Sequence, residues 1–115
     1  MRVKSEIWVG AYLRRCQAES ISVVIVRRGD AAAGAIFISV DRLDGTVCLY
    51  GPAAAGLEGG ETERRWVCCL GAGPVASAEA GAYLARQIEF DADLWIVEVE
   101  DRQGRHFLGD DAVGD

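Results

Sequence analysis

The sequence has little material for several kinds of chemistry. It contains one histidine, one methionine, two prolines and four cysteines, and no Cys-x-x-Cys pair. Structural zinc sites need converging thiolates or imidazoles, so this spacing predicts no metal site, and no motif indicates a cofactor. The cysteines lie in apolar segments, where a free cysteine behaves as a small hydrophobe. We therefore expect reduced, buried thiols at Cys16, Cys48, Cys68 and Cys69.

Long apolar runs are also missing. The run from Ile7 to Leu13 is too short for a signal peptide and is followed by Arg14 and Arg15. No segment approaches the roughly 18 apolar residues that a membrane-spanning helix needs. We expect a cytoplasmic protein with no membrane association. Half of the 115 residues are apolar and 26% are charged, which fits one globular domain over residues 1–115.

A concentrated basic surface, which binding to nucleic acid normally requires, is not evident. Residues 1–50 carry a charge balance of +2 and residues 51–115 one of −8, which together give the net charge of −6. Basic doublets at the ends of elements are typical of solvated edges, so the sequence does not favour a nucleic-acid partner. Weak nucleic-acid binding remains an alternative through the doublets at Arg14-Arg15, Arg27-Arg28 and Arg64-Arg65.

The residues that are present predict two helices and about six strands. Apolar residues recur at helical spacing from Ser5 to about Glu19 and from Val75 to Ile88, where Ser77 is the expected N-cap. The second helix should bury a stripe formed by Ala80, Tyr83, Leu84 and Ile88. Residues 52–63 are small and acidic and predict a mobile loop. Strands are expected at residues 21–28, 35–43, 46–51, 64–70, 94–101 and 105–108.

An internal echo suggests a modular origin. The tetrapeptide GAYL occurs at residues 10–13 and again at residues 81–84, and the same offset lays Ile25 and Val26 on Ile96 and Val97. We interpret this as two αββ modules, residues 5–40 and 76–109. Coincidence between two ordinary helix-to-strand transitions explains the echo equally well.

These elements predict an α+β fold with a mainly antiparallel or mixed sheet. Three strands, residues 23–26, 35–38 and 94–97, are apolar on both faces. A single helix layer would leave one apolar face of the sheet exposed to solvent. Either the helices cover opposite faces, which gives a three-layer α/β/α sandwich, or one face is buried against a second copy. The surplus apolar surface therefore favours a homodimer.

The sequence also predicts the register of two hairpins. Asp44-Gly45 suits a two-residue turn, which would pair Val40 with Leu49 and place Ile36, Ile38, Val40, Val47 and Leu49 on one apolar face. In the second hairpin, Gly104 sets the turn. A three-residue loop pairs Asp101 with Arg105 and Glu100 with His106, and is favoured over a two-residue loop, which opposes like charges.

Candidate functional residues gather in that second hairpin. Glu98 and Glu100 lie at i and i+2 on one strand face, about 7 Å apart, and both registers give His106 an acidic partner, Glu100 or Asp101. A carboxylate neighbour favours the imidazolium, which makes His106 a charged clasp of the hairpin. No serine lies in a nucleophile elbow, so an acid/base or metal-dependent hydrolase that uses Glu98, Glu100 and His106 is an alternative only.

Four stretches carry a resemblance to a known family: RVKSEIWVGAYLRRC, RRGDAAAGAIFI, RLDGTVCLYGP and FDADLWIVEVEDRQGRHFL. Together they span nearly the whole chain, which resembles the bacterial family known only as domain of unknown function 1491. The resemblance implies a small single-domain bacterial protein and brings no activity, ligand or site.

We therefore expect a small cytoplasmic binding or accessory module, homodimeric, that recognises a protein or a small ligand. Enzymatic activity is not favoured because no complete catalytic constellation is evident. The candidate binding face comprises Glu98, Glu100, Asp101, His106, Arg14, Arg15, Arg27 and Arg28.

Overall fold

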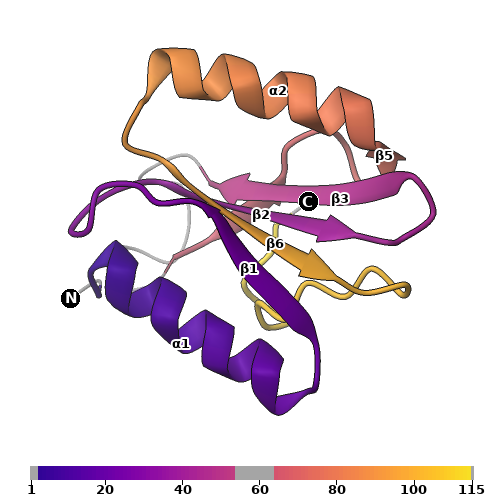
Figure 1. Ribbon diagram of the computed structural model, residues 1–115, viewed down its shortest axis with the longest axis horizontal. Coiled ribbons are helices and arrows are strands. Elements are labelled where there is room, and N and C mark those ends of the chain that lie inside the picture. Colours follow the sequence, from indigo (N-terminus) through magenta and orange to yellow (C-terminus); the bar gives the residue numbers. More distant parts are fainter. Residues whose placement is uncertain (1–2, 54–63, 115) are drawn as a thin grey trace.

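The computed structural model describes residues 3–53 and 64–114, and within them the chain forms two helices and six strands (Figure 1). The strands build one mixed sheet in the order β1-β6-β2-β3-β4, and the short β5 pairs with the free end of β3. The elements are α1 (Ser5–Ala18), β1 (Ser22–Arg27), β2 (Ile36–Asp41), β3 (Thr46–Pro52), β4 (Trp66–Cys68), β5 (Val75–Ala76), α2 (Ser77–Phe90) and β6 (Trp95–Glu100).

The predicted α+β fold with a mixed sheet is confirmed. All strand pairs are antiparallel except β2 and β6, which run parallel. The two helices lie on opposite faces of the sheet, α1 on one side and α2 on the other (Figure 1). The layers therefore follow the three-layer alternative, in which both sheet faces receive a helix without a second copy of the chain.

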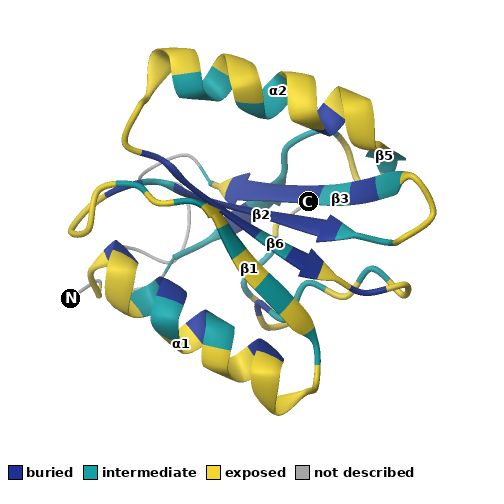
Figure 2. Cartoon of the chain, viewed as in Figure 1, coloured by how far each residue is buried: buried dark blue, intermediate teal, exposed yellow. Residues whose placement is uncertain are grey.

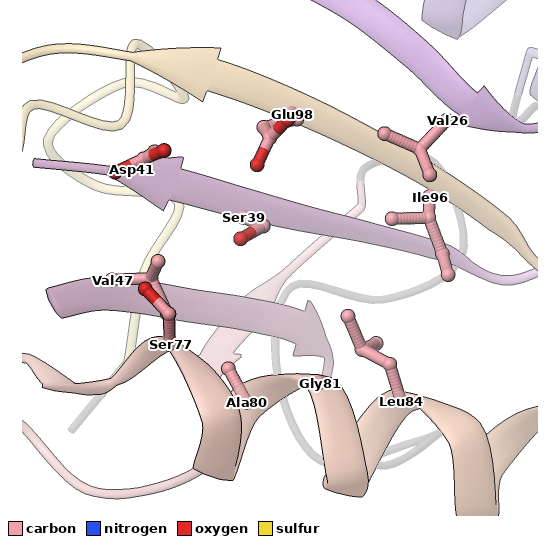
Figure 3. A pocket seen from close by; sticks show the side chains of 10 residues that line it. All are labelled: Val26, Ser39, Asp41, Val47, Ser77, Ala80, Gly81, Leu84, Ile96 and Glu98. Carbon is pink, nitrogen blue, oxygen red and sulfur yellow. The ribbon is translucent and has the colours of Figure 1, made fainter. Parts of the chain in front are cut away.

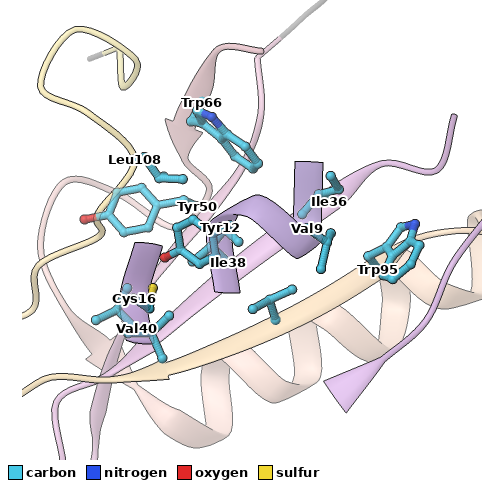
Figure 4. Close-up of a cluster of buried hydrophobic side chains, with 12 residues drawn as sticks. Val9, Tyr12, Cys16, Ile36, Ile38, Val40, Tyr50, Trp66, Trp95 and Leu108 are labelled. Carbon is cyan, nitrogen blue, oxygen red and sulfur yellow. The ribbon is translucent and has the colours of Figure 1, made fainter. Parts of the chain in front are cut away.

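The larger core lies between α1 and the sheet (Figure 4). Val9, Tyr12 and Cys16 recur along the buried face of α1 and are at most 1% exposed. The hydroxyl of Tyr12 donates a hydrogen bond to the backbone oxygen of His106 at 2.6 Å, which ties the helix to the C-terminal loop. Sheet and loop residues complete this core: Ile36, Ile38, Val40, Tyr50, Trp66, Trp95, Val97, Val99 and Leu108.

The smaller core lies between α2 and the other face, around Phe37, Leu94 and Ile96. The predicted apolar stripe of α2 is confirmed, since Ala80 is 3% exposed and the three larger side chains pack against this cluster. Ser77 is the first helical residue rather than the N-cap, and its Oγ donates to the backbone oxygen of Gly45 at 3.1 Å. This bond holds the start of α2 beside the turn that joins β2 to β3.

The prediction of two αββ modules is wrong. A module would pair its own two strands, but β6 lies between β1 and β2, and no second strand follows β6 in the described residues. The two copies of GAYL do share a helical conformation, in α1 and in α2. The two helices cover opposite faces, so the echo reflects two ordinary helices with the same pattern.

The predicted register of the β2–β3 hairpin is wrong by one residue. Val40 pairs with Cys48 and Asp41 with Val47, and the loop contains three residues because the N–H of Arg42 donates to the oxygen of Thr46. A one-residue shift turns every side chain of a strand to the other face. Consequently Val47 and Leu49 face α2, whereas Cys48 and Tyr50 face α1.

The predicted C-terminal hairpin is also wrong. After Glu100 the chain turns through Asp101 to Gly104, where φ is +73°, and then runs as irregular loop. Asp101 and Arg105 do meet, as predicted, but within this turn instead of across a strand pair. The strand predicted at residues 64–70 is limited to Trp66–Cys68, and most of the loop predicted at 52–63 lies outside the described residues.

Residues 23–26, which the sequence shows to be apolar on both faces, are covered on one face only. The strand β1 forms at one edge of the sheet, and its side chains alternate between partly buried and exposed. Val23 and Ile25 pack toward α1, but Val24 and Val26 on the other face are 53% and 58% exposed. Figure 2 shows this exposure along β1 beyond the reach of α2.

Candidate functional site

A groove lies between α2 and the part of the sheet that α2 does not cover (Figure 3). Its floor is formed by the parallel strands β2 and β6, whose register sets Ser39 beside Glu98 and Asp41 beside Glu100. Side chains of a strand alternate between faces, so these four residues share the face that looks toward α2. Residues that are 59 positions apart in the sequence, such as Ser39 and Glu98, thus meet on one surface.

The wall of the groove is α2, and the opposite rim is β1. Gly81 and Leu84 contribute from the helix and Val26 from the edge strand. The cavity has a volume of about 320 Å³, which is at the lower end of the range for small-molecule sites. It is apolar toward Val26, Leu84 and Ile96 and polar toward Asp41 and Ser77 (Figure 3).

The polar end carries negative charge without a compensating cation. Burial raises the pKa of Glu98, and the neighbouring carboxylates of Asp41 and Glu100 raise it further. The carboxylate of Asp41 accepts one hydrogen bond, from the N–H of Leu43 at 2.8 Å to Oδ1. In residues 3–53 and 64–114 no Lys or Arg forms an ion pair with any of these three carboxylates.

A second polar group in the groove also lacks a partner. Ser39 is only 7% exposed, and its hydroxyl points into the space between the sheet and α2 (Figure 3). Within the described part of the chain its Oγ makes no hydrogen bond. The Oγ of Ser39 is not among the fully buried side-chain atoms that lack a partner, so it is accessible from the groove. An accessible hydroxyl beside two carboxylates can accept from or donate to a hydrogen-bonding ligand.

The geometry favours an organic group over a metal ion at this site. Residues 3–53 and 64–114 contain no group of three or more His, Cys, Asp or Glu side chains arranged to hold a metal. An ammonium or guanidinium group can use two carboxylates and a hydroxyl as acceptors without a closed coordination shell. The groove therefore has the donor set for a cation borne on an organic stem.

Of the predicted site residues, Glu98 and Glu100 lie at this groove or next to it, whereas Asp101 does not. The carboxylate of Asp101 is 6% exposed and accepts hydrogen bonds from the backbone N–H, Nε and Nη2 of Arg105 at 2.8 to 3.0 Å. These bonds hold the pKa of Asp101 below its usual range. Its environment is that of a structural turn.

His106 lies on the opposite side of the sheet from Glu98. Its ring packs edge-on against Tyr50, with centroids 5.1 Å apart, and its Nδ1 accepts the N–H of Leu108 at 2.9 Å. Burial lowers the pKa of His106, so the expectation of an imidazolium held by Glu100 or Asp101 is wrong. The sheet separates this imidazole from the two glutamates, and the constellation proposed for a hydrolase does not assemble.

The arginine doublets do not form one surface. Arg14 and Arg15 lie near the end of α1, which leads into the start of β1, whereas Arg27 is the last residue of β1 and Arg28 follows it. The six extended residues of β1 span about 20 Å. Three of them are engaged: Arg15 donates to the oxygen of Phe107, Arg27 to that of Ala92, and Arg28 stacks over Trp95. The geometry gives no support to a nucleic-acid interface.

Sequence reasoning missed Ser39, Asp41 and the α2 wall of the groove. The polar side chains of Ser39 and Asp41 alternate with apolar residues in β2, which indicates a face of mixed polarity but does not show which residues lie beside it. What the sequence could not supply was the parallel pairing of β2 with β6. Without that pairing, nothing in the sequence predicts that Glu98 lies beside Ser39.

Comparison with known proteins gives consistent results. The family model described as a protein of unknown function, DUF1491, matches residues 3–109. The crystal structure of a DUF1491 family protein from Caulobacter crescentus CB15 is similar over 100% of both chains, with 36% identity and a TM-score of 0.79. An NMR structure of a family protein from the same organism, at 36% identity, gives a TM-score of 0.80 over 100% of this chain and 99% of that one.

A third similar structure is that of protein Atu0922 from A. tumefaciens, with 39% identity, a TM-score of 0.74, and coverage of 87% of this chain and 86% of that one. No curated protein matches, and none of the described helices is long and apolar enough to cross a membrane. The match over residues 3–109 and the two full-length structural relatives decide the assignment. The chain belongs to the DUF1491 family, whose function is unknown.

Proposed function

We propose that the protein is a small binding module whose groove between α2 and the sheet receives a positively charged group on an apolar stem. One observation carries this proposal: Glu98 is half-buried without a cationic partner, beside the unpartnered hydroxyl of Ser39. A carboxylate removed from water without a partner costs free energy. A ligand cation would offset that cost, and so would bind more tightly than a neutral group of the same shape.

The other end of the groove suits the stem of such a ligand. Val26, Leu84 and Ile96 line it, and Val26 is 58% exposed. Covering apolar surface contributes about 25 cal/mol for each Å² removed from water. The ligand class is therefore an amine or guanidinium attached to several methylene groups.

A titration with hexylammonium, followed by amide NMR, tests this function. We expect shifts that cluster at Ser39, Glu98 and Gly81, and binding that is about 10-fold tighter than that of hexanol or hexanoate, since one charge-assisted hydrogen bond is worth on that order. Glu98→Gln should abolish the preference. Glu89→Gln removes an equal charge from the exposed end of α2 and should leave the preference for hexylammonium intact. Equal binding of the three probes would refute the proposal.

A second candidate property is self-association through β1. It rests on the exposure of Val24 and Val26 on an edge strand, because exposed apolar edge strands are templates for pairing. Sedimentation equilibrium measures it directly. A concentration-dependent dimer that Val24→Lys dissociates would support the homodimer, and a monomer at all concentrations would exclude it.

We also infer that residues 1–115 act as one domain in the cytoplasm. Cys16, Cys48 and Cys69 form no disulfide bond, and the compartment that keeps thiols reduced is the cytoplasm rather than the cell exterior. Burial raises the pKa of Cys16, Cys48 and Cys69, which keeps them protonated and slow to oxidise. Cell fractionation with a thiol-labelling step tests the location, and recovery of disulfide-bonded protein from outside the cytoplasm would contradict it.

A further inference from the structure

The groove is open on the side of β1, and β1 has an unpaired edge. Among the described residues the backbone of Ser22–Arg27 pairs with β6 alone. Proteins usually protect such an edge with proline, lysine or an early bulge. The sequence SVVIVR has neither proline nor lysine, and its irregularity comes only after Ile25. Residues 22–25 are thus available to accept a further strand.

The exposed face of β1 leads directly to the acidic end of the groove. Val24 is paired with Glu98 and Ser22 with Glu100, so the carboxylates lie one strand inward from the exposed valine. A strand added outside β1 would lie about 10 Å from β6, which is two strand spacings. A lysine on that added strand could lay its four-carbon stem across Val24 and bring its ammonium to Glu98.

We propose that the natural occupant of the groove is a lysine or arginine side chain of an extended segment from another protein, which pairs with the free edge of β1. This inference rests on the proposed function of the groove and adds the identity of the partner. The added strand supplies affinity through main-chain hydrogen bonds, and the groove supplies specificity through one basic side chain, which is the division of roles in strand addition.

Charge decides between this partner and a second copy of the chain. The protein carries a net charge of −6, and the face beside β1 presents Asp41, Glu98 and Glu100. A second copy paired through its own β1 would bring Ser22, Val24 and Val26 to that face. None of these is a cation, so Glu98 would stay without a partner. A basic segment can form hydrogen bonds with the unpaired backbone of β1 and also place a cation beside the carboxylate of Glu98.

The test uses the blocked peptide Thr-Val-Lys-Val-Thr and two matched peptides. One replaces lysine by norleucine, which keeps the stem and removes the charge. The other keeps lysine and carries N-methyl groups on alternate backbone nitrogens, which prevents pairing with a strand. Affinity is measured by calorimetry, and hydrogen exchange of the β1 amides reports strand addition.

We expect the first peptide to bind about 10-fold more tightly than either matched peptide, to slow exchange of the amides in residues 22–25, and to lose its advantage over norleucine in Glu98→Gln. Equal affinity of the N-methylated peptide, with hexylammonium still bound, would overturn strand pairing but leave the proposed function standing. Failure of hexylammonium as well would overturn both. Tighter binding of spermidine than of the peptide, or protection of β1 by dimerisation without peptide, would overturn the choice of partner.

Discussion

Replacing Gly81 by leucine should raise the stability of the protein while it blocks the groove. Gly81 lies in the interior of α2 and lines the groove, and a Cβ placed there meets no atom within 4 Å. Glycine in a helix interior costs about 0.8–1 kcal/mol relative to alanine or leucine. We therefore expect the free energy of unfolding to rise by about 0.8 kcal/mol, which corresponds to about 4 °C in melting temperature for a chain of this length.

The same leucine should occupy the space that a ligand stem would use. Binding of hexylammonium should weaken by about 10-fold or more, because a filled apolar groove offers no surface to cover. The two readouts, thermal unfolding by circular dichroism and titration by calorimetry, should therefore move in opposite senses. A variant that is more stable but binds unchanged would show that the ligand does not lie against α2.

Gly10 provides the matched control. It lies within α1 on the other side of the sheet, and a Cβ there meets only the side chain of Arg14, at 3.6 Å. Gly10→Leu should give a similar gain in stability and leave ligand binding unchanged. If Gly81→Leu instead lowered the melting temperature, the reasoning that no close approach requires glycine at this position would be refuted.

Three further predictions concern the rest of the fold. Asp101→Asn should lower the free energy of unfolding by about 2 kcal/mol, measured in urea, because the buried carboxylate accepts three hydrogen bonds from Arg105; a loss below about 0.5 kcal/mol would contradict this role. Burial lowers the pKa of His106, so on acidification this side chain is protonated in the unfolded chain before it is protonated in the folded one. The free energy of unfolding should therefore fall as the pH drops below about 6.5. The fall should be smaller in His106→Gln, and an equal pH dependence of the two proteins would exclude a contribution of His106. Leu43 has a φ of +63° and is 42% exposed, so Leu43→Gly should raise the free energy of unfolding by about 0.5–1 kcal/mol, measured by thermal unfolding. A loss of stability would refute the idea that the backbone is strained at this residue.

The sequence predicted the helices well because their evidence is local. Apolar residues at helical spacing predict a helix from Ser5 to about Glu19, and α1 is observed at Ser5–Ala18; no distant residue is needed to see this. The register of β2 and β3 is different. Asp44-Gly45 is compatible with a two-residue turn and with the three-residue loop observed, in which Gly45 has a φ of +89°, so local turn chemistry does not choose between them.

Tertiary packing makes that choice. In the observed register Tyr50 is 8% exposed within the α1 core and Leu49 is 3% exposed on the α2 side. The alternative would turn the bulky Tyr50 and the half-buried Cys48 toward the smaller α2 layer. Two cores of different size thus select the register, and their sizes depend on helices that are remote in the sequence.

The prediction of a hairpin in the C-terminal segment was wrong for a related reason. Alternation of side chains and a glycine at 104 are typical of a hairpin, but the carboxylate of Asp101 binds the backbone and side chain of Arg105 and closes the turn early. The chain then crosses the α1 face, where Leu108 is 6% exposed in the core. The pairing of Asp101 with Arg105 could be predicted from the sequence. That this pairing closes a turn and prevents a second strand could not.

The protonation state of Glu98 separates binding from acid catalysis in this groove. Its pKa is raised by burial, with Asp41 and Glu100 as the charged groups that add to the effect, and the titratable side chains of α2 and β1 do not line the groove. A general acid works below its pKa, as the protonated form, whereas a site for a cation works above it, as the carboxylate. Affinity for an ammonium probe should therefore increase as the pH rises through that pKa. Because a bound cation favours the charged form, it should also release a proton from Glu98 in buffers near that pKa, and this coupled release belongs to a binding site rather than to a general acid.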